Sequence, residues 1–164
     1  MIIVGFDPGL ATLGYGVIEK DNKGKISVID YGIVQTPKGE SLSVRLCMLE
    51  EATKQIIDKF KPDEISMEEL FFAKNVKTAI NVAHARGVLL LTCNKVCGRI
   101  FEYTPLQIKQ ALTGYGRADK KQIQKMVQTL LKLKEIPKPD DAADALAVAL
   151  THARTNKLGE QFII

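Results

Sequence analysis

Two short apolar runs in this chain each end in an acidic residue, and this pattern restricts the folds that the chain can adopt. Residues 2–6 are apolar or glycine and are followed by Asp7, and residues 65–67 lead in the same way to Glu68. Runs of this length are typical of buried strands. A carboxylate at the end of a buried strand loses solvation free energy unless a positive charge offsets the loss. A metal ion would supply that charge.

Two further acids lie three residues apart in an alanine-rich segment near the end of the chain. Asp141 and Asp144 occur within residues 140–147, where that spacing places both side chains on one face of a helix. Simpler interpretations exist for single residues. Asp7 precedes Pro-Gly and suits a turn, while Asp140 and Asp141 near a helix start suit capping and the helix dipole. We interpret Asp140 as a cap and the other acids as candidates for a shared site.

Hydrophobic periodicity and turn residues predict an alternation of strands and helices. The predicted strands span residues 2–7, 13–19, 25–36, 64–68 and 99–103. The predicted helices span residues 42–59 and 76–94, a short segment that starts at 105, and residues 119–133 and 140–154. A flexible loop is expected over 114–117. The order indicates an α/β domain with a mixed sheet of five strands.

The order of these elements predicts where the acids meet. The first three strands suit an antiparallel meander, and the fourth follows a helical crossover, so it should run parallel to an existing strand. If it lies beside the first, Asp7 and Glu68 emerge together at the carboxyl ends of parallel strands, where α/β sheets place their sites. The helix that carries Asp141 and Asp144 could place both side chains at the same edge of the sheet. Grouped carboxylates raise one another's pKa and suit Mg²⁺ or Mn²⁺. Two such ions about 4 Å apart suit phosphoryl displacement.

Composition sets broad limits on this interpretation. The chain has 164 residues, of which 46% are hydrophobic, which suits one domain over residues 1–154 followed by a tail over 155–164. The last three residues of this tail are apolar enough to dock on the domain. No apolar run is long enough to span a bilayer, and the start lacks the features of a signal peptide, so a cytoplasmic location is expected. Three cysteines argue against a disulfide framework, and the net charge of +4 is compatible with a polyanionic partner.

Several motifs, in order and with matching spacing, resemble the RuvC family of bacterial Holliday-junction resolvases. They are Phe6-Asp7-Pro8-Gly9, Gly14-Tyr15-Gly16-Val17, residues 67–75, residues 83–88, Phe101-Glu102-Tyr103, residues 107–110 and residues 141–147. The resemblance covers roughly residues 1 to 154. It implies a ribonuclease H-like fold with a five-stranded mixed sheet flanked by helices.

The resemblance also implies an activity and a set of catalytic residues. Asp7, Glu68, Asp141 and Asp144 match the family's metal-binding catalytic acids. The implied enzyme is a homodimer that uses Mg²⁺, with two ions per site and Mn²⁺ as a possible substitute. It nicks two strands of like polarity in a four-way junction and leaves 5′-phosphate and 3′-hydroxyl ends. The branch-migration proteins RuvA and RuvB are its expected partners.

A second set of residues is predicted to contact DNA. Phe71 and Phe72 follow Glu68 on an expected loop, where an exposed aromatic ring could stack on a base, and the family favours Phe71 for this role. Polar and basic residues nearby are candidates for gripping phosphates, a contact that positions DNA without reading sequence. They are Lys74, Asn75, Lys77, Lys109, Arg117, Lys120 and Lys121. Tyr115 could stack or pack locally, and the sequence does not choose between these.

The predicted helix over residues 76–94 resembles the family's dimer-forming element. Its small residues Ala79, Val82, Ala83 and Ala85 would permit a close approach of two helices, with Arg86 beside them. Both histidines, His84 and His152, are expected in packing or surface positions rather than as metal ligands.

Other functions fit parts of the sequence. Residues 7–16 resemble the phosphate-binding hairpin of actin-like phosphotransferases, but a chain of this length leaves no room for the second lobe that encloses a nucleotide. A catalytically silent junction-binding module would not need all four acids. A nuclease of the same fold that acts on RNA is disfavoured by the Phe71 loop.

Overall fold

The computed structural model describes residues 1–69, 76–155 and 163–164. Its strands are β1 (Ile2–Asp7), β2 (Thr12–Lys20), β3 (Ile26–Gln35), β4 (Glu64–Glu68) and β5 (Ile100–Tyr103). Its helices are α1 (Leu42–Phe60), α2 (Val76–Val96), α3 (Pro105–Thr113), α4 (Lys120–Leu130) and α5 (Asp140–Thr155).

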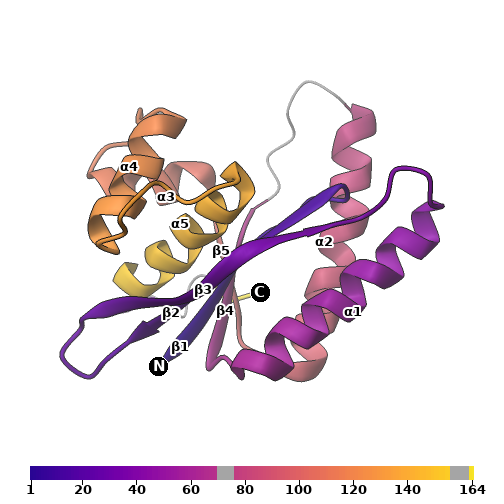
Figure 1. Ribbon diagram of the computed structural model, residues 1–164, viewed down its shortest axis with the longest axis horizontal. Helices are drawn as coiled ribbons and strands as arrows, with labels where there is room; N and C mark the ends of the chain where they lie inside the picture. Colours follow the sequence, from indigo (N-terminus) through magenta and orange to yellow (C-terminus); the bar gives the residue numbers. More distant parts are fainter. Residues whose placement is uncertain (70–75, 156–162) are drawn as a thin grey trace.

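The strands form one mixed sheet in the order β3-β2-β1-β4-β5. β1, β2 and β3 pair antiparallel, whereas β4 pairs parallel with β1 and β5 pairs parallel with β4. Both the predicted meander and the predicted parallel fourth strand are therefore confirmed. Helices α1 and α2 lie on one side of the sheet, and α3, α4 and α5 lie on the other (Figure 1).

Alternation along the strands produces two cores, one on each face of the sheet. In β1, Ile3 packs with the cluster beneath α3, α4 and α5, while its neighbour Val4 packs with the cluster beneath α1 and α2. Ile18 and Val17 of β2 divide in the same way. The period of two explains why β1 reads as a continuous apolar run, because it is covered on both faces.

Helix α5 lies against the sheet with almost no space between the backbones. Three glycines make this possible, because a Cβ atom at any of them would overlap α5. A Cβ at Gly5 would meet Ala145 O, one at Gly14 would meet Asp141 O, and one at Gly16 would lie 2.8 Å from Leu146 N. A glycine in a strand often marks such an approach of another backbone. The small side chains of α5 and these glycines therefore pack directly against each other.

The helix boundaries differ from the predicted ones mainly at one C-terminus. The helix predicted over 119–133 ends at Leu130, because the chain turns at Leu131 and Lys132 adopts a positive φ of 54°. Its N-terminus is closed by a capping box: Asp119 accepts a hydrogen bond from Gln122 N, and the Gln122 side chain accepts one from Asp119 N.

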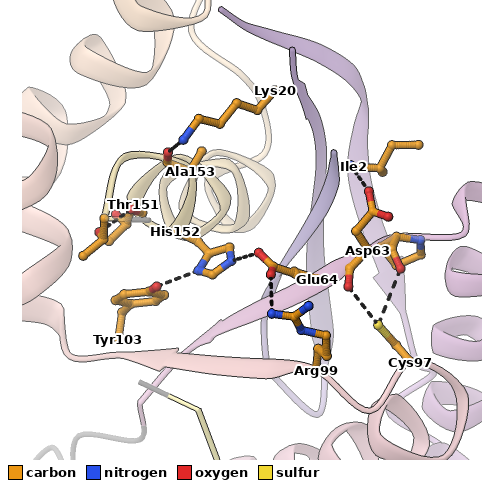
Figure 2. A network of polar contacts seen from close by, with 12 residues as sticks. Ile2, Lys20, Asp63, Glu64, Cys97, Arg99, Tyr103, Thr151, His152 and Ala153 are labelled. Carbon is orange, nitrogen blue, oxygen red and sulfur yellow. Dashed lines mark hydrogen bonds and ion pairs between the residues drawn. The ribbon is translucent and has the colours of Figure 1, made fainter. Parts of the chain in front are cut away.

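A buried polar network joins α5 to β4 and β5 at the opposite end of α5 from its acids (Figure 2). The two ring nitrogens of His152 lie 2.6 Å from the Tyr103 hydroxyl and 2.7 Å from Glu64 Oε2. Arg99 pairs with the other oxygen of Glu64 at 3.0 Å. The pKa of His152 is lowered, chiefly by burial, with the nearby Glu64 carboxylate opposing the shift. A neutral ring can donate to Glu64 and accept from Tyr103, so one tautomer satisfies both contacts.

The last residues of the chain pair with β5. Ile163 forms a β-bridge with Phe101, and Ile164 N donates to Ile100 O at 3.1 Å. The expectation that the apolar end of the tail docks on the domain is confirmed for these two residues. Within the described residues, no helix combines the length and the apolar content that crossing a lipid bilayer requires.

Candidate active site

Asp7 and Glu68 lie at the same edge of the sheet on adjacent strands. Asp7 is the last residue of β1 and Glu68 is the last residue of β4. The parallel register pairs Phe6 with Met67, so the two acids that follow these residues emerge side by side. This is the edge at which the sequence predicted a site, at the carboxyl ends of parallel strands.

Helix α5 brings the other two acids to this edge. Gly14 pairs with Asp7 in the sheet, and the absence of a side chain at Gly14 lets the Asp141 backbone lie directly over it. Asp144 follows three residues later, on the same side of α5. The sheet edge and the first turns of α5 therefore place the four acids in one neighbourhood.

The electrostatics confirm that the carboxylates are neighbours. The pKa of Asp7 is raised to about 7, chiefly by burial, with the charges of Asp144, Glu68 and Asp141 contributing and that of Lys120 opposing the shift. The pKa of Glu68 is raised to about 6, chiefly by burial and also by the charge of Asp144, while Lys120 and Lys109 oppose the shift. Acids with pKa values this high are poorly compensated as anions, and a bound cation would stabilise their charged forms.

Lys120, from the first turn of α4, supplies a positive charge to this group. Its Nζ lies 2.9 Å from Asp144 Oδ2 and 3.2 Å from Asp140 Oδ2. Asp140 also accepts a hydrogen bond from Gln124 Nε2 at 2.9 Å. The interpretation of Asp140 as a helix cap is therefore wrong: it is the first residue of α5, and its side chain binds α4 instead.

A pocket of about 200 Å³ opens between these acids and the basic side of α3 and α4. It is lined by Glu68, Asp144, Lys109, Lys120, Pro105, Ile108, Ile123 and Ala147. Negative groups at its base and lysines on its wall suit a phosphate that approaches a metal-loaded acidic cluster.

The side chains do not form a closed cage. Among the residues that the structure describes, no group of three His, Cys, Asp or Glu side chains is arranged to hold one metal ion. The pairing of Asp144 with Lys120 is one reason, since it directs that carboxylate towards α4.

The predicted DNA-contacting residues divide into two groups. Lys109 and Lys120 line the pocket, and Arg117 and Lys121 are exposed. Phe71, Phe72, Lys74 and Asn75, together with the side chain of Lys77, lie outside the described part of the chain.

Neither histidine lies in the acidic group. His84 is exposed on α2, and His152 is buried in the network with Glu64 and Tyr103. No spacing in the sequence links residues this far apart, so the pattern of residues does not predict this network. The contact between Gly14 and the Asp141 backbone was likewise not predicted.

Comparison with known proteins places the chain in a family. The family model for the crossover junction endodeoxyribonuclease RuvC matches residues 3–152. A crossover junction endodeoxyribonuclease RuvC of Clostridioides difficile is 56% identical over 158 residues, which cover 96% of this chain and 93% of that protein. A RuvC of Alkaliphilus oremlandii is 53% identical over 164 residues, covering 100% and 99%.

Solved structures agree with this assignment. T. thermophilus RuvC in complex with a Holliday junction substrate superposes with a TM-score of 0.93 at 34% identity, covering 100% of this chain and 99% of that one. The yeast mitochondrial Holliday junction resolvase Ydc2, at 14% identity and a TM-score of 0.67 over 93% and 78% of the two chains, shares the fold. The expected ribonuclease H-like fold is thereby confirmed, and the chain belongs to the RuvC family of crossover junction endodeoxyribonucleases.

Proposed function

We propose that this protein is a structure-specific endodeoxyribonuclease that resolves Holliday junctions during recombination and DNA repair. The observation that carries the proposal is the convergence of Asp7, Glu68 and Asp144 at one edge of the sheet, where burial and then the charges of Asp144 and Glu68 raise the pKa of Asp7. These residues come from three separate segments of the chain, and they adjoin a pocket with two lysines on its wall. Metal-dependent hydrolysis of a phosphodiester is the chemistry that such a site serves.

We assign Asp7, Glu68, Asp141 and Asp144 as the residues that would hold the metal, with two Mg²⁺ ions as the preferred cofactor and Mn²⁺ as a substitute. Oxygen donors fit these hard cations. The raised pKa values of Asp7 and Glu68 and the ammonium group beside Asp144 indicate that this edge of the sheet attracts positive charge. The chemistry such ions supply is stabilisation of negative charge on the attacking and leaving oxygens.

The protein's own groups would position the DNA strand. Lys109 and Lys120 on the pocket wall would bind the phosphates beside the cleaved bond, and Arg117 and Lys121 would bind the strand outside the pocket. Phe71, Phe72, Lys74, Asn75 and Lys77 remain predicted DNA contacts. The expected products carry a 5′-phosphate and a 3′-hydroxyl, which a ligase can join.

We infer a homodimer that forms through α2. Ala85 and Arg86, predicted to lie near the dimer contact, face inward instead: Ala85 is in the core beneath α1, and Arg86 pairs with Glu102. A different stripe is exposed, formed by Ile80, His84, Gly87 and Leu91 at the spacing of one helix face.

Gly87 supports this choice of face. A glycine inside a helix is less favourable than alanine by about 1 kcal/mol. A Cβ atom at this position would meet nothing within 4 Å in the described chain, so packing within the subunit does not require it. The close approach of α2 from a second subunit would require a residue without a side chain at this position. A two-fold dimer matches a four-way junction, which is itself nearly two-fold symmetric, and would nick two strands of like polarity.

The proposal also has a cellular context. We expect the enzyme to act in the cytoplasm, where its DNA substrate lies, together with the branch-migration proteins RuvA and RuvB.

Oligomeric state can be tested separately by sedimentation of Leu91→Glu, which should convert a dimer to a monomer because it places a charge on the proposed contact.

A cleavage assay tests the function directly. A labelled synthetic four-way junction and a linear duplex of the same sequence are incubated with Mg²⁺ and either the wild type or Asp7→Asn. We expect paired nicks in the junction, little cutting of the duplex, and loss of nicking with retained junction binding in the variant. Equal cutting of the duplex would overturn the resolvase assignment. ATP hydrolysis without nicking would favour the phosphotransferase alternative. Junction binding without nicking would favour the catalytically silent module.

A further inference from the structure

Two large apolar side chains are exposed at the rim of the candidate active site and have no role in the machinery described above. Leu106 is 54% exposed near the start of α3, and Tyr115 is 47% exposed in the turn between α3 and α4. Leu106 lies one helical turn before Lys109, whose side chain lines the pocket. The two residues are therefore neighbours on the surface of α3.

The turn that carries Tyr115 folds back on α3. A Cβ atom at Gly116 would overlap Leu106 Cδ1 and would lie 3.8 Å from Gln110 Cγ, so the backbone beside Tyr115 packs directly on this helix. Leu106 and Tyr115, which we call the ledge, thus belong to one surface that leads into the pocket.

The ledge is built on fixed backbone rather than on a loose loop. Gly114 ends α3 with a φ of 81°, and its N–H donates to Gln110 O at 2.9 Å. The Thr113 hydroxyl lies 2.9 Å from Tyr115 O and 3.4 Å from Tyr115 N. At the other end of α3, Thr104 and Gln107 form a reciprocal capping box that fixes the turn carrying Leu106. An apolar surface that is held in place can accept a flat partner at little cost in conformational entropy.

The surroundings indicate what kind of partner would cover the ledge. Basic residues are close to it in the sequence: Lys109 lies three residues after Leu106, and Arg117 lies two residues after Tyr115. Lys120 lines the pocket and Lys121 is exposed, and this positive charge favours a polyanion. Basic groups interleaved with an exposed aromatic ring are the pattern by which proteins hold single-stranded or distorted nucleic acid, with bases stacked on the ring. A DNA strand that reaches the pocket would pass over this surface.

We propose that a nucleobase of the cleaved strand, next to the phosphate in the pocket, stacks on Tyr115 and contacts Leu106. This inference rests on the proposed function, because it needs junction DNA as the substrate. It adds an apolar contact with a base to the phosphate contacts already assigned.

Salt dependence separates this contact from a phosphate contact. Junction binding is measured by fluorescence anisotropy over a series of salt concentrations, in the Asp7→Asn background to prevent cleavage. Tyr115→Ala should weaken binding on the order of ten-fold at every salt concentration with an unchanged slope, because an aromatic side chain releases no counterions. Arg117→Gln should make the slope shallower by about 0.7 to 0.9. Tyr115→Phe should bind like the parent, since it keeps the ring.

A fluorescent base reports the stacking itself. With 2-aminopurine on either side of the cleaved phosphate, the parent should quench one of the two positions, and Tyr115→Ala should lose that quenching. Ile29→Ser is the matched control, because Ile29 is 44% exposed on β3 and its loss should change neither measurement.

Three outcomes would overturn the proposal that a base stacks on the ledge. They are unchanged affinity and quenching in Tyr115→Ala, a shallower salt slope in that variant, and an equal loss of binding in Ile29→Ser. A parent that fails to bind the junction at all would instead overturn the proposed function, so the two failures are distinguishable.

Discussion

Gly14 shows how one residue can control the geometry of the acidic group. It pairs with Asp7 in the sheet and leaves the space into which the Asp141 backbone fits. Any side chain there has to displace either the strand or the start of α5. The acids themselves would remain, but Asp141 would move away from Asp7.

Gly14→Ala is therefore expected to weaken metal binding although all four acidic residues are still present. Overpacking of this kind typically costs about 1–3 kcal/mol of stability. We expect that loss, together with at least about ten-fold weaker Mn²⁺ binding by calorimetry. Gly39→Ala is the control, because a Cβ at Gly39 meets nothing within 4 Å. Metal affinity equal to that of the wild type would contradict the role given to Gly14.

Lys120 competes with the metal for Asp144 in our interpretation. Lys120→Met removes a positive charge that is hydrogen-bonded to a proposed ligand. We expect several-fold tighter Mn²⁺ binding in calorimetry, but weaker junction nicking, because a phosphate contact is lost. Lys125→Met lies on the same helix, where Lys125 bonds only Gln128 among the contacts described, and should change neither. Weaker metal binding in Lys120→Met would rule out competition.

At the scale of elements, α5 is held at both ends by different means. Near its start the glycines of β1 and β2 allow backbone contact, and near its end His152 bonds to Glu64 of β4 and Tyr103 of β5. Tyr103 also pairs with Glu68 in the sheet. The network in Figure 2 therefore fixes α5 on the two strands at the far edge of the sheet, one of which carries a proposed catalytic acid.

His152→Phe should be unusually destabilising for a substitution of similar size. It leaves the buried Glu64 carboxylate without the hydrogen bond from the neutral imidazole, and an unsatisfied buried polar group costs about 1–3 kcal/mol, more where the group is charged. Thr151→Val, next to it in α5, removes only a bond to Ala147 O and should cost about 1 kcal/mol. Urea unfolding of the metal-free proteins measures both. Similar losses in the two variants would show that the network contributes no more than an ordinary hydrogen bond.

For the whole molecule, the raised pKa values connect stability to pH. Asp7 titrates near 7 and Glu68 near 6 in the folded protein, against 3.8 and 4.5 as ordinary values. The folded state then holds more protons than the unfolded state across this interval, so these acids make the metal-free protein less stable as pH rises from about 4 to 7. His152 acts in the opposite direction, because its lowered pKa means that stability increases as pH rises through about 6.5.

Comparison of the wild type with Asp7→Asn isolates the first effect, since both keep His152. We expect the free energy of unfolding of the metal-free wild type to fall, relative to the variant, by on the order of 3 kcal/mol between pH 4 and pH 8. Saturating Mg²⁺ at pH 8 should restore stability to the wild type only. Parallel pH profiles for the two proteins would mean that Asp7 is not held in a repulsive, buried group.

The sequence by itself determined the elements and the identity of the candidate acids. Local chemistry is sufficient for this: β1 is apolar because both its faces are buried, Asp119 starts α4 by capping, and the spacing of Asp141 and Asp144 fixes their common helix face. The resemblance of the motifs also gave the family that the comparisons later showed. Boundaries shifted where the chain adopts a positive φ that composition does not encode, as at Lys132.

Only the tertiary structure decided which partners these residues meet. Asp140 was expected to cap its own helix but binds Lys120 and Gln124 of α4, and His152 reaches Glu64, 88 positions away in the sequence. Gly14 lies against the Asp141 backbone, which no local pattern indicates. Such contacts depend on the order of strands in the sheet and on the docking of α5 across it. Burial and long-range charge then set the pKa values, so the electrostatics of the site exist only in the folded chain.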